Sequence, residues 1–194
     1  MDKILIIYNP ISGPRSTTKI LQSLVSSLQE KSIKITIKNT LYPGHATKLC
    51  KSNHLQQYNT VIICGGDGTF NEAVNGLMLN FSISLPTIGF LPGGTGNAFM
   101  HDLQAVNHKI AIEKILNKKT KKIDILQLQF NNRIEYAINI VGWGMATDIL
   151  ILSEKMRFLG SARYSLASIY YIFNKKIYKT QCIIDGKEIN NKKY

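Results

Sequence analysis

The chain has 194 residues and a net charge of +12, with 44% hydrophobic and 19% charged residues. This balance is typical of a globular protein with a substantial core and excludes a disordered or fibrous chain. The apolar stretches are too short for a membrane span or for a signal peptide. The three cysteines show no CxxC spacing, so we expect reduced thiols, a cytoplasmic protein and no zinc site.

The basic residues are concentrated in the second half of the chain. Residues 1–104 have a net charge of +3, and residues 105–194 have a net charge of +9. Two explanations stay open: a polyanionic partner, either nucleic acid or an anionic membrane surface, or lysines that only solvate the protein surface. The same two explanations apply to the lysine run at 118–122.

The first half of the chain alternates between strand and helix patterns. Apolar runs at 4–8, 61–63 and 87–91 predict buried strands, and the alternation over 33–37 predicts a strand with one exposed face. Apolar residues at helical spacing predict helices over 16–28, 70–77 and 107–117, and a short helix is expected over 45–55. A further helix is expected to start at Asn97, with Asn97 as its cap. We therefore predict an α/β fold, a mainly parallel sheet with helices on both faces.

The pattern changes after about residue 120. Segments 122–130 and 134–141 predict a hairpin, and a helical region follows over about 150–173. A strand over 177–184 ends at Asp185 and Gly186, a typical hairpin turn. We predict an α/β domain over 1–120 and the beginning of a second, β-rich domain over 121–194.

Glycine-bearing loops follow three of the predicted strands, at 9–14, 65–69 and 92–97. The carboxyl ends of parallel strands share one edge of the sheet, so these loops should meet there, where such sheets bind ligands. Glycines let backbone N–H groups approach phosphate oxygens, and a helix N-terminus adds a favourable dipole. The loops favour a phosphate-binding site; the alternative is a set of tight turns. Neither the GxxxxGK[ST] pattern nor GxGxxG after the first strand is present, which disfavours a P-loop enzyme and a Rossmann dehydrogenase.

Asp67 is an acid inside the second loop. A carboxylate repels phosphate unless Mg²⁺ lies between them or the carboxylate takes up a proton, and both uses fit phosphoryl transfer. The alternative is that Asp67 only caps the helix that follows. In the other loops, the Thr95 hydroxyl can reach a phosphate oxygen, and Arg15 is a charge partner close to the first loop.

At this point the sequence resembles the diacylglycerol kinase catalytic-domain superfamily, which includes the sphingosine kinases and is distantly related to NAD kinases. The segments that carry the resemblance are NPISG at 9–13, GGDGTFNEAVNGL at 65–77 and LPGGTGNAF at 91–99. The resemblance implies an ATP-binding domain over 1–120 and a partial lipid-binding domain over 121–194. It implies an ATP-dependent lipid kinase with ATP and Mg²⁺ as cofactors, whose acceptor is a sphingoid base, ceramide or diacylglycerol.

The resemblance also implies roles for single residues. Asp67 matches the aspartate assigned to catalysis, which either deprotonates the lipid hydroxyl or organises Mg²⁺, and no separate metal site is implied. For Glu72 a nucleotide contact and a stabilising role at the helix N-terminus stay open. The positions that match the nucleotide site are Asn9, Pro10, Ser12, Gly13, Thr40, Gly65, Gly66, Gly68, Thr69, Asn71, Glu72 and Thr95.

The second half is similar to the sphingosine and ceramide kinases in GWG at 142–144 and SEKMRFLGSARY at 153–164. Arg157 and Arg163 match two arginines that contact ATP phosphates in those enzymes, and a guanidinium suits that bidentate contact. Sphingosine kinases carry two acids before this segment. Asp148 matches the first and is the predicted substrate-binding residue. In those enzymes the second acid recognises the sphingoid amine, and Leu150 stands at its position here. A neutral acceptor therefore stays open.

The expected partners are a lipid substrate, an anionic membrane surface to which the protein attaches peripherally, and a second copy of the chain in a homodimer. Nucleic acid is not expected, because aromatic and basic residues do not form the pattern of a stacking groove. NAD kinase shares GGDGT, but the other motifs disfavour it. A non-catalytic nucleotide- or lipid-binding module stays open, because the family's second domain continues beyond the last residue here.

Overall fold

The computed structural model describes residues 2–13, 16–80, 85–94, 96–160, 162–174, 176–178 and 181–189. The chain forms two compact units, residues 1–139 and residues 140–194. The domain boundary predicted at residue 120 falls inside the first of these units.

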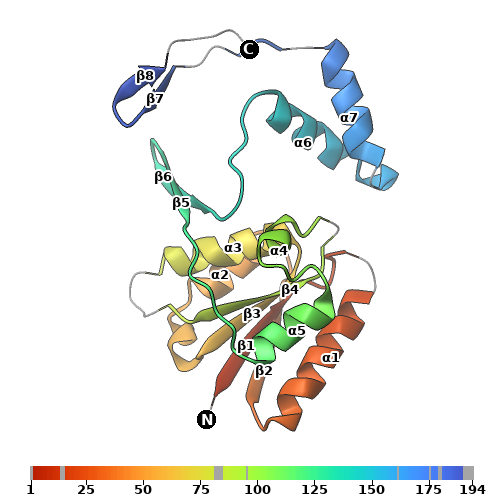
Figure 1. The fold of residues 1–194 in the computed structure, drawn as a ribbon, viewed down its shortest axis with the longest axis vertical. Helices are drawn as coiled ribbons and strands as arrows, with labels where there is room; N and C mark the ends of the chain where they lie inside the picture. Colours follow the sequence, from red (N-terminus) through yellow and green to blue (C-terminus); the bar gives the residue numbers. More distant parts are fainter. Residues whose placement is uncertain are drawn as a thin grey trace. The chain divides into compact units, whose positions relative to one another are not determined.

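A four-stranded parallel sheet forms the centre of the first unit (Figure 1). In spatial order its strands are β2 (Lys34–Asn39), β1 (Lys3–Tyr8), β3 (Thr60–Gly65) and β4 (Thr87–Pro92). After β2 the chain crosses to the other side of β1 to form β3. The boundary between β1 and β3 is therefore a topological switch point, the place where open α/β sheets bind ligands.

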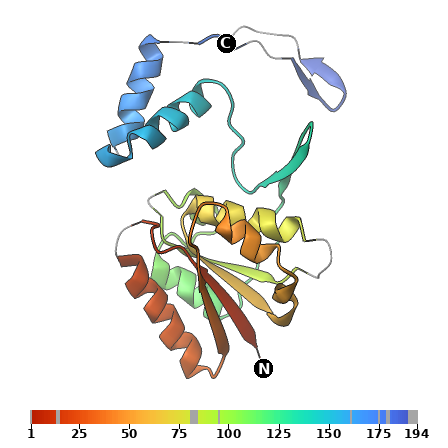
Figure 2. The ribbon, with the colours of Figure 1, turned by 180° about the vertical axis from the view of Figure 1, so that it is seen from behind.

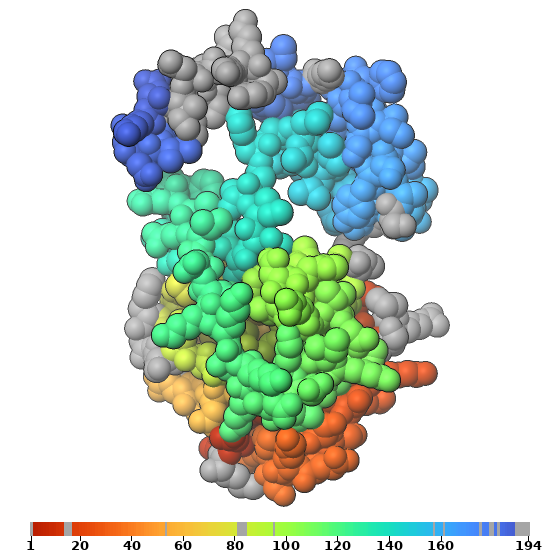
Figure 3. Space-filling model, in the orientation of Figure 1, coloured from red at the N-terminus to blue at the C-terminus, as the bar shows by residue number. Residues whose placement is uncertain are grey.

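Helices cover both faces of this sheet, which confirms the predicted fold class (Figure 1 and Figure 2). On one face, α1 (Ser16–Glu30) contacts α5 (His108–Leu116), and on the other α2 (His45–Cys50) packs against α3 (Asp67–Met78). The short helix α4 (Ala98–Asp102) follows β4. Figure 3 shows α4 and α5 on the near face of this unit.

The core lies between the sheet and the helices. Ile6 and Ile62 are register partners in the two central strands, and both side chains are fully buried. From α1, Leu24 and Leu28 stand one turn apart and are also buried. The strands predicted from the apolar runs at 4–8 and 61–63 are confirmed as β1 and β3. These runs lack polar residues because helices cover both faces of the two strands.

Two cysteines belong to this core. Cys50 and Cys64 are fully buried, and burial raises the pKa of each thiol to about 12. Both remain protonated at neutral pH and behave as small apolar side chains.

The predicted short helix over 45–55 is wrong in its extent. Helix α2 ends at Cys50, and a separate 3-10 helix runs over Asn53–Gln57. The Ser52 hydroxyl accepts a hydrogen bond from the N–H of His54 at 3.4 Å and so starts this second helix. A serine that caps a new helix is the signal that the sequence reading missed.

A hairpin completes the first unit. Its strands are β5 (Leu126–Phe130) and β6 (Arg133–Ala137), and β6 contacts α3. Both strands are shorter than predicted, because the pairing starts at Leu126 and stops at Ala137.

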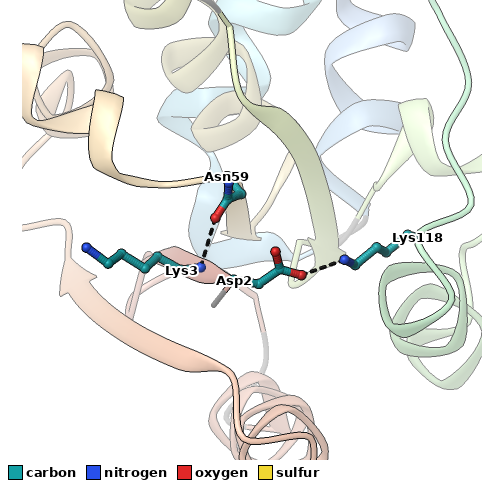
Figure 4. A network of polar contacts seen from close by, with 4 residues as sticks. All are labelled: Asp2, Lys3, Asn59 and Lys118. Atoms are coloured by element: carbon teal, nitrogen blue, oxygen red, sulfur yellow. Dashed lines mark hydrogen bonds and ion pairs between the residues drawn. The ribbon is translucent and has the colours of Figure 1, made fainter.

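The edge of the sheet where the strands begin carries two polar contacts (Figure 4). Lys118, just after α5, forms an ion pair with Asp2, and the N–H of Lys3 donates to Oδ1 of Asn59 at 3.0 Å. The lysine run that begins at Lys118 therefore starts at the edge opposite the glycine-bearing loops.

The second unit contains α6 (Met145–Lys155), a 3-10 helix (Arg157–Leu159), α7 (Ala162–Phe173) and a hairpin of β7 (Cys182–Ile184) with β8 (Lys187–Ile189). Helices α6 and α7 pack against each other. The strand predicted over 177–184 begins only at Cys182, and residues 179–180 lie outside the described residues. No helix in the described part of either unit is long and apolar enough to cross a membrane.

Candidate active site

The three glycine-bearing loops meet at the carboxyl-end edge of the sheet. The N–H of Asn9 donates to the carbonyl of Cys64 at 2.9 Å, and the N–H of Gly93 donates to the carbonyl of Gly65 at 2.7 Å. These bonds continue the pairing of β1 with β3, and of β3 with β4, past the ends of the strands. The loops are therefore fixed against one another by main-chain contacts.

Glycines allow this arrangement because the loops touch through their backbones. A Cβ atom on Gly13 would lie 1.8 Å from the carbonyl oxygen of Gly93, and one on Gly94 would lie 2.7 Å from Cα of Gly66. Gly13 also has a φ of +66°, which side chains disfavour. Close packing of the loops is thus a structural reason for these glycines.

Gly68 has a different environment. It lies in the first turn of α3, it is exposed, and a Cβ atom there would have no neighbour within 4 Å. No contact between described residues requires a glycine at this position. The open surface lies where the N–H groups of a helix N-terminus attract anions.

Polar side chains join the loops further. The Asn9 amide donates from Nδ2 to the Thr69 hydroxyl at 2.8 Å and accepts at Oδ1 from the N–H of Ile11 at 3.2 Å. The Ser12 hydroxyl donates to the carbonyl of Gly93 at 3.3 Å. Pro10 lies in the turn between these two residues. Three predicted nucleotide-binding residues therefore already form hydrogen bonds within their own loop or with a neighbouring loop: Asn9, Ser12 and Thr69.

Asp67 is the first residue of α3, within the second glycine-bearing loop, and it is half-buried. Its Oδ2 accepts from the N–H of Ala98 at 3.0 Å, and its Oδ1 accepts from the N–H of Phe99 at 3.3 Å. Asp67 therefore caps α4 and not its own helix, which corrects the alternative considered from the sequence. Each carboxylate oxygen has a second lone pair. Asp67 can thus accept a proton or bind a cation while it keeps both contacts to α4.

Asn97 does not cap α4 with its side chain, contrary to the prediction. Its backbone is left-handed, with a φ of +50°, and its amide forms two hydrogen bonds with Gly94. Oδ1 accepts from the Gly94 N–H at 3.0 Å, and Nδ2 donates to the Gly94 carbonyl at 2.9 Å. Asn97 closes the loop so that the first N–H groups of α4 point at Asp67. Thr95 lies outside the described residues, as does Arg15.

The loop after β2 lies at the same edge. The N–H of Thr40 donates to the carbonyl of Tyr8 at 2.8 Å, so Thr40 stands beside the end of β1. The following turn is held by His45, whose Nδ1 accepts from the N–H of Leu41 at 3.1 Å. The ring of Tyr42 stacks on His45 with the centroids 4.6 Å apart.

A cavity of about 400 Å³ lies along the exposed face of α3. Asn71 and Glu72, two predicted nucleotide-binding residues, line it. The Glu72 carboxylate has no hydrogen bond or ion pair with any residue that the structure describes. Glu72 is the sixth residue of α3, beyond the first turn in which a helix dipole acts. The other lining residues are Thr47, Asn75, Leu79, Arg133, Ile134 and Glu135.

The remaining predicted residues belong to the second unit. The side chain of Arg157 lies outside the described residues. The Arg163 guanidinium is mostly buried, lies 3.4 Å from Glu154 and donates to the Tyr164 hydroxyl at 2.7 Å. Its Nε is buried and makes no hydrogen bond with any residue that is described. The Asp148 carboxylate accepts a hydrogen bond from the Tyr178 hydroxyl at Oδ2, and its Oδ1 lies 3.9 Å from the Lys176 ammonium.

Comparisons with known proteins identify the same family that the three loop motifs resemble. The family described as the diacylglycerol kinase catalytic domain matches residues 3–128. Sphingosine kinase 1 of Arabidopsis thaliana is 30% identical over 180 residues, which cover 88% of this chain and 37% of that protein. The diacylglycerol kinase of Bacillus subtilis is 31% identical over 192 residues, which cover 96% of this chain and 61% of that protein.

Solved structures give the same result. A diacylglycerol kinase from Bacillus anthracis matches with a TM-score of 0.73 and 27% identity, over 98% of this chain and 61% of that one. The chain thus spans between 37% and 61% of the length of these relatives. The resemblance seen in the motifs is confirmed. The chain belongs to the diacylglycerol kinase catalytic domain family, whose members similar to this chain are lipid kinases.

Proposed function

We propose that this chain transfers the γ-phosphate of ATP to a hydroxyl of a long-chain lipid. One observation carries the proposal. The Asp67 carboxylate belongs to the second of three packed glycine-bearing loops and is held by two N–H groups of α4, at the edge of a sheet where ligands bind. Positioning of the reactants and neutralisation of the phosphate charge supply most of the rate in phosphoryl transfer. The fixed Asp67 carboxylate would serve the first, and the N–H groups at the start of α3 would serve the second.

The first turn of α3 is the proposed phosphate site, because Gly68 leaves its surface open. Asp67 would accept the proton of the lipid hydroxyl or bind Mg²⁺ with its remaining lone pairs. Among the described residues no group of three or more His, Cys, Asp or Glu can hold a metal ion. Asp67 would supply one carboxylate to a Mg²⁺ ion that also binds phosphate oxygens and neutralises their charge.

The cavity along α3 is the proposed binding site for the rest of the nucleotide. Glu72 lies four residues after Gly68, about 6 Å further along the helix axis. Asn71 and Glu72 offer an amide and a carboxylate to the polar edges of a ligand there. Arg157 and Arg163 are proposed phosphate contacts, and for Arg163 this role requires that its pair with Glu154 opens.

Peripheral attachment to an anionic membrane from the cytoplasm is part of the proposal. The lysine run at 118–122 does not support it directly, because Lys118 lies at the edge opposite the loops. Residues 140–194 carry nine basic and four acidic side chains, a net charge of +5, and this unit supports attraction to anionic lipids.

The test is transfer of labelled γ-phosphate from Mg-ATP to sphingosine, ceramide and diacylglycerol in mixed micelles, with NAD as a further acceptor. We expect one or more labelled lipids and no labelled NAD. Asp67→Asn is the matched control, because an amide keeps one acceptor for α4 but has no negative charge. It should remove the product while ATP binding persists.

Each other outcome has a clear meaning. Labelled NAD without labelled lipid would contradict the lipid acceptor. ATP binding without any phosphorylated acceptor would favour a non-catalytic nucleotide-binding module. Equal transfer by the unchanged protein and Asp67→Asn would exclude Asp67 as the catalytic residue.

A further inference from the structure

The carbonyl of Gly93 joins the third glycine-bearing loop to the first loop and to α1. The Ser12 hydroxyl donates to this carbonyl at 3.3 Å, and the Thr17 hydroxyl donates to it at 3.4 Å. A carbonyl oxygen has two lone pairs, so it can accept from both hydroxyls at once. Ser12 belongs to the first loop and Thr17 to the first turn of α1. Two side chains from neighbouring parts of the chain therefore hold one oxygen of the third loop.

This carbonyl lies in buried surroundings. Gly93 is buried, and a Cβ atom on Gly13 would lie 1.8 Å from its oxygen. Thr17 closes another side, since a Cβ atom on Gly93 would lie 2.7 Å from Cγ2 of Thr17. A buried carbonyl that loses its hydrogen-bond donors and cannot reach water raises the free energy of the state in which this happens. The Gly93 oxygen therefore depends on donors from the protein.

The two hydroxyls differ in what else they can reach. Thr17 is only 2% exposed, and its single proton can serve either the Gly93 carbonyl at 3.4 Å or the Ser12 carbonyl at 3.3 Å. Ser12 is half-buried and is one of the residues predicted to bind the nucleotide. A Ser12 hydroxyl that donates its one proton to a phosphate oxygen can no longer donate to Gly93. Phosphate binding through Ser12 would therefore remove one of the two donors.

We propose that Thr17 is a positioning residue of the nucleotide site, whose hydroxyl keeps the Gly93 carbonyl paired when the Ser12 hydroxyl turns to a phosphate. This inference rests on the nucleotide binding that the proposed function requires. In the unliganded protein both hydroxyls hold the Gly93 carbonyl. In the complex Thr17 donates to Gly93 alone, and water replaces Thr17 at the Ser12 carbonyl, because that contact is only part-buried. Without the Thr17 hydroxyl, phosphate binding would remove both donors from a buried oxygen.

The test is a double-mutant cycle on the Kd for Mg-ATP, measured by isothermal titration calorimetry without any lipid. Thr17→Val keeps the β-branched shape and removes the hydroxyl. It should raise the Kd about fivefold to tenfold, since Ser12 can then serve the phosphate or Gly93 but not both. In the Ser12→Ala background the same substitution should change the Kd less than about twofold, because phosphate binding then takes no donor away from Gly93.

Two variants serve as controls. Thr18→Val removes the hydroxyl of the next threonine in α1, which pairs with the Tyr8 hydroxyl at 2.8 Å, and it should leave the Kd unchanged. Thr17→Ser keeps the hydroxyl and should bind Mg-ATP within about twofold of the unchanged protein. Thermal unfolding gives a second readout. Ser12→Ala and Thr17→Val together should lower the Tm by more than the sum of the two single shifts, because only the double variant removes both donors from Gly93.

Three results would overturn the inference. The first is an equal rise of the Kd in both backgrounds, which would show that Thr17 only stabilises the fold. The second is an unchanged Kd in Thr17→Val, and the third is a Thr17→Ser variant that binds as weakly as Thr17→Val. The kinase proposal is judged separately by the transfer assay. Coupling between Ser12 and Thr17 without any labelled lipid supports the inference and contradicts the kinase, whereas labelled lipid without coupling does the reverse.

Discussion

The side-chain amide of Asn75 binds both main-chain groups of Tyr136. Its Nδ2 donates to the Tyr136 carbonyl at 2.8 Å, and its Oδ1 accepts from the Tyr136 N–H at 2.8 Å. The amide takes the place of a neighbouring strand, and it attaches β6 to α3. Since Asn75 also lines the cavity along α3, this pair of bonds fixes one wall of the proposed nucleotide site.

Removal of this amide should release the hairpin. Asn75→Ala leaves the N–H and carbonyl of Tyr136, which are partly buried, without partners, and we expect a loss of about 2 kcal/mol in the free energy of unfolding of the first unit. The hydrogen exchange of the Tyr136 amide should become faster. Asn71→Ala is the matched control, since Asn71 is exposed one turn earlier on the same helix. An unchanged exchange rate at Tyr136 in Asn75→Ala would contradict this role.

Gly68 and Gly13 should respond in opposite ways to alanine. At Gly68 the new Cβ meets no atom within 4 Å and alanine favours a helix, so the free energy of unfolding should rise by about 0.5 kcal/mol. The methyl group would nevertheless obstruct a phosphate, so the Kd for ATP should increase. Gly13→Ala should destabilise the fold, because its Cβ would overlap the Gly93 carbonyl at a φ of +66°.

Calorimetry with and without ATP measures both effects in one experiment. Gly44→Ala is the control for backbone strain alone, since Gly44 has a φ of +85° and no neighbour within 4 Å of its Cβ position. Equal ATP affinity of the unchanged protein and Gly68→Ala would exclude the first turn of α3 as the phosphate site.

Asp67 should contribute to stability as well as to activity. Asp67→Ala leaves the N–H groups of Ala98 and Phe99 without an acceptor and should cost about 1 kcal/mol, the usual effect of losing a helix cap. Asp67→Asn keeps one acceptor and should cost less, although both variants should lose phosphate transfer. Urea denaturation compares the two. An Asp67→Ala variant as stable as the unchanged protein would show that α4 does not depend on this contact.

The ion pair of Asp2 with Lys118 should give a small dependence of stability on pH. The hydrogen bond and the charge of Lys118 lower the pKa of the Asp2 carboxyl below its ordinary value of 3.8. Because the folded pKa is the lower one, the stabilisation is fully present above the unfolded pKa and is lost as the pH falls through the folded pKa. Titration by NMR should show the lowered pKa in the unchanged protein and a value closer to 3.8 in Lys118→Met.

Most strands and helices of the first unit could be predicted, because each has a hydrophobic pattern within its own segment of the sequence. The apolar run at 61–63 and the helical spacing from Phe70 to Leu77 reflect burial on both faces of β3 and on one face of α3. The hairpin ends were predicted less well, because β5 is largely exposed, β6 is only partly buried, and hydrophobicity does not mark where their pairing stops.

The details of the site could not be predicted, because they depend on contacts between distant segments. Asn75 and Tyr136 are 61 residues apart, and Asp67 and Ala98 are 31 residues apart. Asn97 also gave the wrong signal, since asparagine favours both a helix cap and the left-handed backbone that it adopts here. The glycines of the three motifs suggested a phosphate cradle, but contacts between the loops account for Gly13, Gly66 and Gly94 equally well.

The contact of Gly13 with Gly93, and of Gly66 with Gly94, has a thermodynamic consequence for any ligand of this edge. Loops that pack backbone against backbone lose their conformational freedom when the chain folds, and not when a ligand arrives. A nucleotide that binds here would therefore bind to a preorganised surface, with little loss of loop entropy on association. The same contacts couple the described parts of the three loops, since Gly13 lies against Gly93 and Gly66 against Gly94.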